Sequence, residues 1–395
     1  MTGTQHGENQ APQPESADAA GEVARLFLRL GFTAFGGPAA HIAMMHDEVV
    51  TRRKWMDNQE FIDLVGATNL IPGPNSTEMA IHIGYRRAGW RGLLLAGFAF
   101  ILPAVAIVLL LAWLYVQYGQ SPQGVALMYG VKPVLIAVVA QALLKLAPSA
   151  LRSPLLWAIA LVALALFLAG VNELAILFGG ALLLMLFRLL QRMPTAAAGV
   201  LPLASLKALI PAASLDSTVT LWPLFLVFLK AGSLLYGSGY VLLAFLRNDL
   251  VVNLGWLTDA QLLDAIAIGQ FTPGPVFSTA TFIGYMLAGL PGAAVATIGI
   301  FLPSFVFVAL LARIMPLLRR AWWSAAFLDG VNATSLALMA GVTLQLGQAA
   351  IVDLATVLLA LGAAVALFQF KLNSAWVVLA GGAVGLTLHL LGVVA

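Results

Sequence analysis

Hydrophobic residues dominate the chain from about residue 23 onward, in long stretches separated by short polar segments. Stretches near residues 93–116, 127–146, 154–171 and 173–190 come close to the roughly 20 apolar residues that a helix needs to cross a bilayer. The stretch near residues 24–46 is expected to cross as well, and comparable stretches fill the second half. The pattern predicts an all-α polytopic membrane protein.

Composition supports the same class and narrows the chemistry. Hydrophobic residues make up 61% of the 395 positions and charged residues only 9%, against roughly a quarter in soluble domains. Residues 1–22 are polar and proline-rich, which predicts a disordered tail. The chain has no cysteine and only five scattered histidines, so neither a metal site nor a cofactor is expected. The lipid bilayer is the expected surrounding, and nucleic acid is not an expected partner.

The second half of the chain repeats the first. At a shift of 201 residues, Trp55 corresponds to Trp256 and Pro72-Gly73-Pro74 to Pro273-Gly274-Pro275. Beyond a one-residue gap, at a shift of 200, Ile83-Gly84-Tyr85 corresponds to Ile283-Gly284-Tyr285. The register persists too long for chance, so two homologous repeats are expected. Their boundaries are predicted at residues 23–190 and 222–395, with a linker at 191–221.

Each Pro-Gly-Pro triplet interrupts a hydrophobic stretch with backbone that cannot remain helical. Residues 60–71 and 75–84 on either side of the first triplet are each too short to cross the membrane. Non-helical backbone at membrane depth is tolerated where it lines a cavity. Each repeat is therefore predicted to contain about five transmembrane helices plus one re-entrant Pro-Gly-Pro helical hairpin.

The basic residues predict how each repeat is oriented in the membrane. Lys and Arg crowd residues 51–55 and 85–91, and the loop 117–124 has none. In the second half the distribution is reversed, because residues 285–290 have no basic residue while Arg313, Arg319 and Arg320 follow the next helix. Since basic loops favour the cytoplasm, the two repeats are expected to have inverted topologies. The resulting path puts the N-terminal tail outside and the C-terminus in the periplasm.

The helix that follows the first triplet begins with short polar residues, Asn75, Ser76 and Thr77, which are suited to capping it. Its N–H groups and positive dipole end would form an anion site near the middle of the membrane. Glycine-containing breaks near residues 36 and 237 are expected to pack against the hairpins, while Asn69 and Gln270 either bind substrate or hold the hairpins closed. The predicted substrate-binding residues are Gly36, Gly37, Pro38, Asn69, Pro72, Gly73, Pro74, Asn75, Ser76, Thr77, Gly237, Ser238, Gln270, Pro273, Gly274, Pro275, Ser278 and Thr279.

Four ionisable residues are candidates for charge balance or coupling. Arg29 and Lys230 occupy equivalent positions in the repeats, where they either balance an anion's charge or extend to the membrane interface. Glu78 and His41 can exchange protons, and a role in packing is the alternative for each. The second repeat replaces Asn75 and Ser76 with Val276 and Phe277 by position, so the two hairpins are not expected to contribute equally.

A family resemblance rests on these same residues. The run Phe35-Gly36-Gly37-Pro38 with His41, the stretch Leu70–Thr77 and the stretch Ile83–Gly92 together resemble the chromate ion transporter family. Nearly the whole chain after the tail resembles the long form of that family, in which two homologous domains are fused. The resemblance implies a multi-pass protein of the bacterial inner membrane that exports chromate and confers chromate resistance, with sulfate as a close structural analogue.

Function is therefore expected to be secondary transport and not catalysis. No G-x-x-x-x-G-K-[ST] motif is present, which argues against built-in ATP hydrolysis. Two alternatives remain open at this stage: a transporter for sulfate or another oxyanion, and, less favoured, a membrane enzyme acting on lipid phosphates. The second would require an arginine beside its serine and clustered carboxylates, which Ser76 and Glu78 do not provide. A homodimer is also left open.

Overall fold

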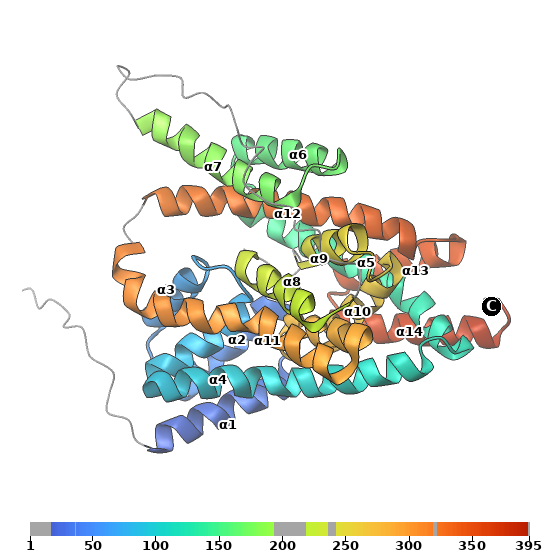
Figure 1. Cartoon of the computed structure of the whole chain (residues 1–395), viewed down its shortest axis with the longest axis horizontal. Helices are drawn as coiled ribbons and strands as arrows, with labels where there is room; N and C mark the ends of the chain where they lie inside the picture. The colour runs from blue at the N-terminus through green and yellow to red at the C-terminus, as the bar shows by residue number, and fades with distance from the viewer. Residues whose placement is uncertain (1–16, 36, 193–218, 236–241, 319–321, 394–395) are drawn as a thin grey trace, which may run out of the picture.

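The computed structural model describes residues 17–35, 37–192, 219–235, 242–318 and 322–393. Within these ranges the chain is helical and forms no strand (Figure 1). The first repeat comprises α1 (Ala17–Thr33), α2 (Gly37–His46), the π-helix η1 (Asp47–Arg52), α3 (Asn58–Thr68), α4 (Asn75–Tyr118), α5 (Pro122–Ala150), α6 (Pro154–Leu168) and α7 (Glu173–Arg192). The second comprises α8 (Leu221–Leu234), α9 (Leu242–Leu246), the π-helix η3 (Arg247–Asn253), α10 (Asp259–Phe271), the 3-10 helix η4 (Val276–Ser278), α11 (Thr279–Leu318), α12 (Trp322–Ala350), α13 (Leu354–Phe368) and α14 (Ser374–Leu390).

The two-repeat helical architecture predicted from the sequence is confirmed, and equivalent caps begin equivalent helices. Asp57 caps α3 by accepting from the Glu60 N–H, and Thr258, 201 residues later, caps α10. Likewise Ser153 caps α6 and Asp353, 200 residues later, caps α13. A side-chain oxygen at the N-cap satisfies one of the free N–H groups of the first turn. Most of the predicted linker, residues 193–218, lies outside the described residues.

The first hydrophobic stretch, expected to cross the membrane at residues 24–46, forms a helical hairpin instead. Helix α1 ends at Thr33, and α2 begins at Gly37 with a φ of +79°. The Arg87 side chain joins the two ends of the hairpin, because it donates to Glu22 at 2.8 Å and lies over the Trp55 ring at 5.3 Å. The chain therefore returns to the end of the molecule from which α1 started.

The Pro-Gly-Pro hairpin of the first repeat, called the first hairpin below, confirms the predicted break at the triplet; its equivalent in the second repeat, α10 with the first arm of α11, is called the second hairpin. Helix α3 and the first arm of α4, residues 75–87, flank the first triplet. The chain then reverses at Ala88 and Gly89, whose φ is +57°, and residues 90–118 form the long second arm of α4. Gly84 and Gly92 face each other across this reversal so closely that a Cβ on either would overlap the other's backbone. The reversal is repeated at Ala288 and Gly289 in α11.

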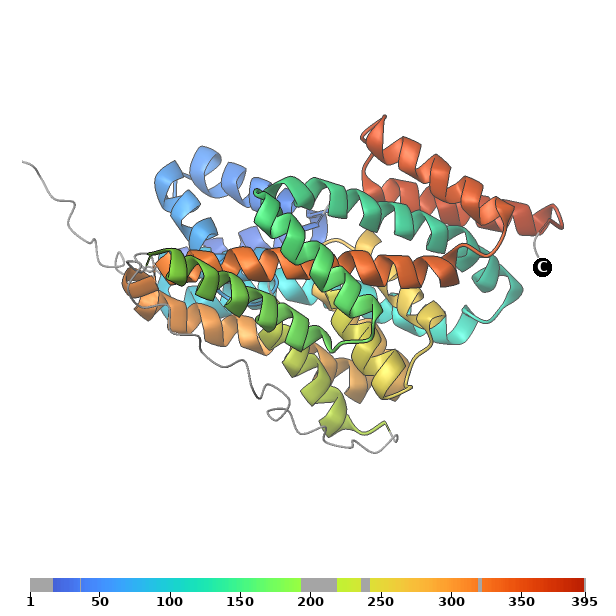
Figure 2. The same ribbon diagram turned by 90° about the horizontal axis from the view of Figure 1, so that it is seen from above.

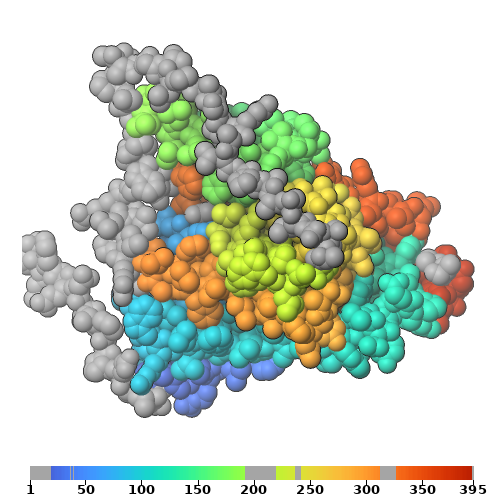
Figure 3. Space-filling model, in the orientation of Figure 1, coloured from blue at the N-terminus to red at the C-terminus, as the bar shows by residue number. Residues whose placement is uncertain are grey.

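The two repeats are interleaved. Helix α4 packs against α11, α5 packs against α13 and α14, and α12 packs against α6 and α7. The face in Figure 3 shows the same arrangement, with second-repeat residues in orange and yellow-green between the first repeat's cyan α4 and its green α6 and α7. The long arms of α4 and α11 run in opposite directions, since they end at opposite ends of the molecule in Figures 1 and 2.

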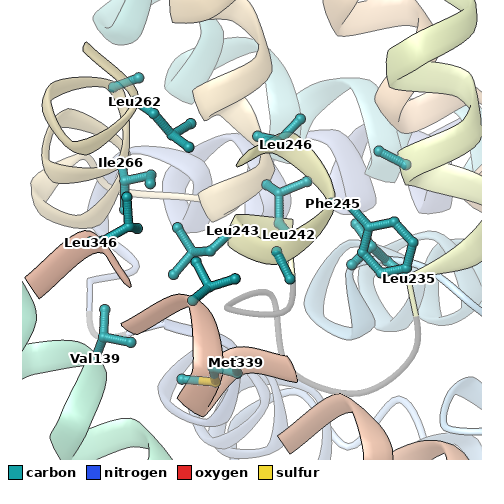
Figure 4. Packing of buried hydrophobic residues seen from close by; sticks show 14 of the residues in the cluster. Val139, Leu235, Leu242, Leu243, Phe245, Leu246, Leu262, Ile266, Met339 and Leu346 are labelled. Atoms are coloured by element: carbon teal, nitrogen blue, oxygen red, sulfur yellow. The ribbon is translucent and has the colours of Figure 1, made fainter. Parts of the chain in front are cut away.

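The main core lies where the repeats meet. Figure 4 shows Leu242, Leu243 and Phe245 of α9 packed with Val139 of α5 and Met339 of α12, so residues from both repeats share one hydrophobic cluster. In the described part of the chain, five helices are long and apolar enough to cross a membrane: α4, α5, α7, α11 and α12, the α11 span beginning within η4. Large apolar side chains on α6 and α13 are exposed, among them Trp157, Leu161 and Leu358, as is typical of lipid-facing helices.

Candidate functional site

The two Pro-Gly-Pro tips are each hydrogen-bonded to the opposite repeat. The Gly73 N–H donates to the Leu235 carbonyl at 2.6 Å, and the Gly274 N–H donates to the Ala34 carbonyl at 2.9 Å. Because Gly73 is equivalent to Gly274 and Ala34 to Leu235, the two bonds form a reciprocal pair, as a pseudo-two-fold axis requires. Each hairpin tip therefore meets the broken first helix of the other repeat.

The first tip combines strained backbone with an uncapped helix. Pro72, Gly73 and Pro74 are buried, and Gly73 has a φ of +138°, which side chains rarely allow. Pro74 is the N-cap of α4 and supplies no side-chain hydrogen bond, so the short polar residues that follow do not cap this helix. Asn75 donates instead to the Asn69 side chain at 2.7 Å and joins the two arms of the hairpin.

Buried polar groups gather behind this tip. Ser76, Thr77 and Glu78 are at most 2% exposed, and the Thr77 hydroxyl and both Glu78 carboxyl oxygens have no hydrogen-bond partner among the described residues. Glu78 folds back against Gly73, where an added Cβ would collide with its carboxyl. Ser304 of α11 reaches the same point, 3.1 Å from that Cβ position, and its hydroxyl is also without a described partner.

Ser304 is a residue that sequence reasoning missed. It lies outside the Pro-Gly-Pro motif and more than 200 positions from Gly73. The available signal was the repeat alignment, in which Leu302-Pro303 corresponds to Leu102-Pro103, so that Ser304 is aligned with an alanine, Ala104. A hydroxyl in only one of two equivalent membrane helices marks a difference between the repeats.

The second tip keeps the backbone geometry but has no amide, carboxyl or hydroxyl at the positions equivalent to Asn75, Glu78 and Ser304, respectively. Gly274 has a φ of +88°, and a Cβ there would lie 2.9 Å from the Ala104 methyl group. Helix α11 is preceded by the 3-10 turn η4, and the Thr279 hydroxyl donates to the Val276 carbonyl at 2.8 Å. Ser278 is buried, and its hydroxyl has no partner among the described residues. Gln270 is also buried, at the end of α10.

The breaks in the first helices are described in part. Gly37 and Pro38 begin α2, while Gly36, Gly237 and Ser238 lie outside the described residues. His41 is buried and meets the Phe100 ring edge-on, with ring centroids 5.7 Å apart. It also forms a hydrogen bond with the backbone of Ala34, which places it beside the second tip.

Arg29 and Lys230 are both ion-paired in the hairpins to which they belong. Arg29 contacts Glu48 of η1, and Lys230 contacts Asp249 of η3 at 2.8 Å, again at positions related by 201 residues. Burial opposes ionisation of Glu48, but hydrogen bonds from Arg29 and Arg53 outweigh it and lower the pKa of this carboxyl below its usual value. In this arrangement Arg29 ties α1 to η1 and Lys230 ties α8 to η3, and a carboxylate of the protein balances the charge of each cation.

The second hairpin has an additional attachment. Asp264 of α10, 4% exposed, accepts from the Tyr115 hydroxyl at 2.7 Å and lies 3.2 Å from the Lys132 ammonium. Both partners belong to the first repeat. The equivalent residue of the first hairpin, Asp63, accepts from Gln59 one turn earlier on its own helix. Among the described residues, no group of three potential ligands could hold a metal ion.

Comparison with known proteins agrees with this duplicated arrangement. The model of the chromate transporter family matches the chain twice, over residues 21–185 and 222–386. A chromate transport protein of Cupriavidus metallidurans is 35% identical over 94% of this chain and 96% of its own length. One of Pseudomonas aeruginosa is 34% identical, with 91% and 90% covered. No solved structure is significantly similar. The two family matches and these relatives show that the chain belongs to the chromate transporter family.

Proposed function

We propose that this protein exports chromate through the bacterial inner membrane as a secondary transporter and thereby confers chromate resistance. The observation that carries the proposal is the reciprocal contact of the two tips, Gly73 with Leu235 and Gly274 with Ala34. Broken helices that meet at a repeat interface in mid-membrane are the usual substrate sites of secondary transporters. Family membership supports chromate as the substrate.

The anion binds at the first tip in this proposal. The N-terminus of α4 has no side-chain cap, and the Thr77 N–H donates to the Pro74 carbonyl at 2.7 Å. The ligand is therefore proposed to bind at the N–H groups of Asn75 and Ser76 and at the positive dipole end of the helix. The buried hydroxyl of Thr77 and the carboxyl of Glu78 have no described partner, although a buried polar group left unpaired costs about 1–3 kcal/mol. A polar ligand at this tip would offset that cost.

Export requires no ATP because chromate is a dianion. Moving negative charge out of a cell with an inside-negative potential is favourable by about 2.3 kcal/mol per charge for each 100 mV. Arg29 and Lys230 are each paired to a carboxylate, so neither supplies a free positive charge to hold the anion in this proposal. A site made of neutral hydrogen-bond donors would therefore bind the anion without a fixed counter-charge, which favours its release on the other side.

Glu78 is proposed as the coupling residue. An ionised carboxylate would repel a dianion at the adjacent helix end, whereas the protonated carboxyl can donate a hydrogen bond to it. Anion binding and proton binding at Glu78 are then linked, so the two are transported together. Proteoliposomes containing a pH-sensitive dye would show chromate-driven proton movement for the wild type and none for Glu78→Gln. Equal proton movement in both would contradict this role.

The repeats are proposed to be inserted in opposite orientations, as the basic loops and the opposite directions of α4 and α11 support. Glu22 at the start of α1 pairs with Arg87 of the basic segment, so α1 begins on the cytoplasmic side in this arrangement, not outside. The C-terminal end of the chain, which follows α14, is then on the periplasmic side. Reporter fusions at Gly89 and Gly289 are expected to give opposite phenotypes, and matching phenotypes would refute the inversion.

Purified protein in liposomes tests the function itself. Inward-directed gradients of labelled chromate should give uptake and outward-directed gradients efflux, and both rates should depend on the membrane potential. In cells, Asn75→Ala or Ser76→Ala should abolish chromate resistance without loss of membrane expression. Equal transport of sulfate at the same concentrations would make the protein a general oxyanion transporter. Release of phosphate from lipid substrates would instead support the enzyme alternative.

A further inference from the structure

Ser304 is a polar side chain that the second repeat contributes to the first tip, beside Gly73. It lies on α11, is fully buried, and its hydroxyl oxygen lies 3.1 Å from the position that a Cβ on Gly73 would occupy. The Glu78 carboxyl borders the same space. Ser304 thus lies beside the helix break at which the oxyanion is proposed to bind.

The hydroxyl of Ser304 has no hydrogen-bond partner among the described residues. A serine inside a helix normally donates to the carbonyl three or four residues earlier, and Thr334 and Thr343 of α12 do so. A buried hydroxyl without a partner costs free energy that a well-packed alanine would avoid. Its position beside the unpartnered Glu78 carboxyl at Gly73, one residue after the unpartnered Thr77 hydroxyl in the chain, points to a ligand at this tip.

The pseudo-symmetric position gives an internal comparison. At the second tip, Gly274 faces the methyl group of Ala104 where Gly73 faces the hydroxyl of Ser304. No carboxyl-bearing residue occurs between Pro275 and Ile283. Ser278 contributes one unpartnered hydroxyl there, whereas the Thr279 hydroxyl is bonded to its own helix. At Gly73, polar side chains of both repeats therefore meet, whereas the atoms nearest the Cβ position of Gly274 belong to the Ala104 methyl group and to backbone carbonyls.

We propose that Ser304 is a substrate-contacting residue, which makes the first tip a composite oxyanion site built by both repeats. Its hydroxyl donates to an oxygen of a tetrahedral oxyanion, while the N-terminus of α4 and Thr77 bind the other side. Since α11 and the first hairpin belong to different repeats, relative movement of the repeats separates Ser304 from the α4 terminus and weakens the site. The inference rests on the proposed function, and it adds Ser304 of the second repeat to the anion site proposed there.

The test measures chromate transport by full-length protein in liposomes, with Ser304→Ala as the main variant. Loss of a hydrogen bond to a charged ligand is expected to raise the KM for chromate about tenfold or more. Ser335→Ala is the matched control, because Ser335 of α12 is also buried and unpartnered among the described residues but is not among the contacts of either tip. Its KM should stay within about twofold of the wild type, as should that of Ala104→Ser.

Two further measurements separate the possible results. Ser304→Cys nearly keeps the volume but loses the strong donor, so its KM should change as that of Ser304→Ala does. Without ligand, both variants should melt in detergent at the wild-type temperature or above it, because the unpartnered hydroxyl is removed. If Ser304→Ala and Ser335→Ala have the same KM, Ser304 is not a substrate contact, and the composite site is wrong. If the wild type moves no tetrahedral oxyanion, the proposed function fails whatever Ser304 does.

Discussion

The two hairpin tips share a backbone and differ in chemistry. Both place a glycine with positive φ beside the opposite repeat, and both donate a hydrogen bond across the interface. The first tip faces Ser304 and Glu78, whereas the second faces Ala104. The duplicated tips have therefore kept the same backbone geometry, while the side chains proposed to bind the ligand have diverged. The comparison supports the proposal of one principal substrate site, at one of two tips that have the same backbone geometry.

The two Pro-Gly-Pro hairpins also differ in how they are attached to the rest of the protein. The second hairpin is bound to the first repeat through Asp264, which contacts Lys132 and Tyr115. The first hairpin carries its matching acid, Asp63, next to Gln59 of its own helix. Asp63 is only half-buried, so the first hairpin has no equivalent fully buried acid at this position.

The largest effect is expected from adding a side chain at the first tip. Gly73→Ala should abolish chromate transport, because the backbone at φ +138° disfavours any side chain and the new methyl group would displace Glu78 and Ser304. Gly66→Ala is the control, since Gly66 lies in α3 of the same hairpin with open space around it. Transport in liposomes measures both variants. Normal transport by Gly73→Ala would show that this tip need not keep its shape.

A large loss of stability is expected when the attachment of the second hairpin is broken. Lys132→Met leaves Asp264 buried without its cation and should lower the free energy of unfolding by about 3 kcal/mol or more. The double variant Lys132→Met/Asp264→Leu should recover much of that loss. Thermal unfolding in detergent gives the comparison, with Asp63→Asn as the control in the first hairpin. A similar loss for Asp63→Asn would remove the difference between the hairpins.

The smallest effect is expected for the hydrogen bond that joins the arms of the first hairpin. Asn69→Ala and Asn75→Ala each remove the 2.7 Å bond, and a double-mutant cycle should give a coupling energy of about 1 kcal/mol in stability. Only Asn75→Ala is expected to abolish resistance, because Asn75 lies in the first turn of α4. Equal loss of transport in both single variants would mean that hairpin closure alone explains the role of Asn75.

Much of the fold was predictable because it depends on local properties of the chain. Apolar length indicates helices in a membrane, self-similarity indicates duplication, and Pro-Gly-Pro must interrupt a helix wherever it occurs. The stretch at residues 24–46 misled for the same reason. Two short arms that turn back at Gly37 are as hydrophobic, taken together, as one helix that crosses, and only the contacts of Arg87 with Glu22 and Trp55 distinguish them.

The sequence by itself determined the class of protein, its two repeats, the two helix breaks and the polar residues Asn75 to Glu78 of the first. Only the tertiary structure decided which residues meet there. The pairing of Gly73 with Leu235, the approach of Ser304 and the attachment of Asp264 to Lys132 each join residues more than 100 positions apart. Such contacts arise from how the interleaved repeats pack, and no local pattern of hydrophobicity or propensity encodes that packing.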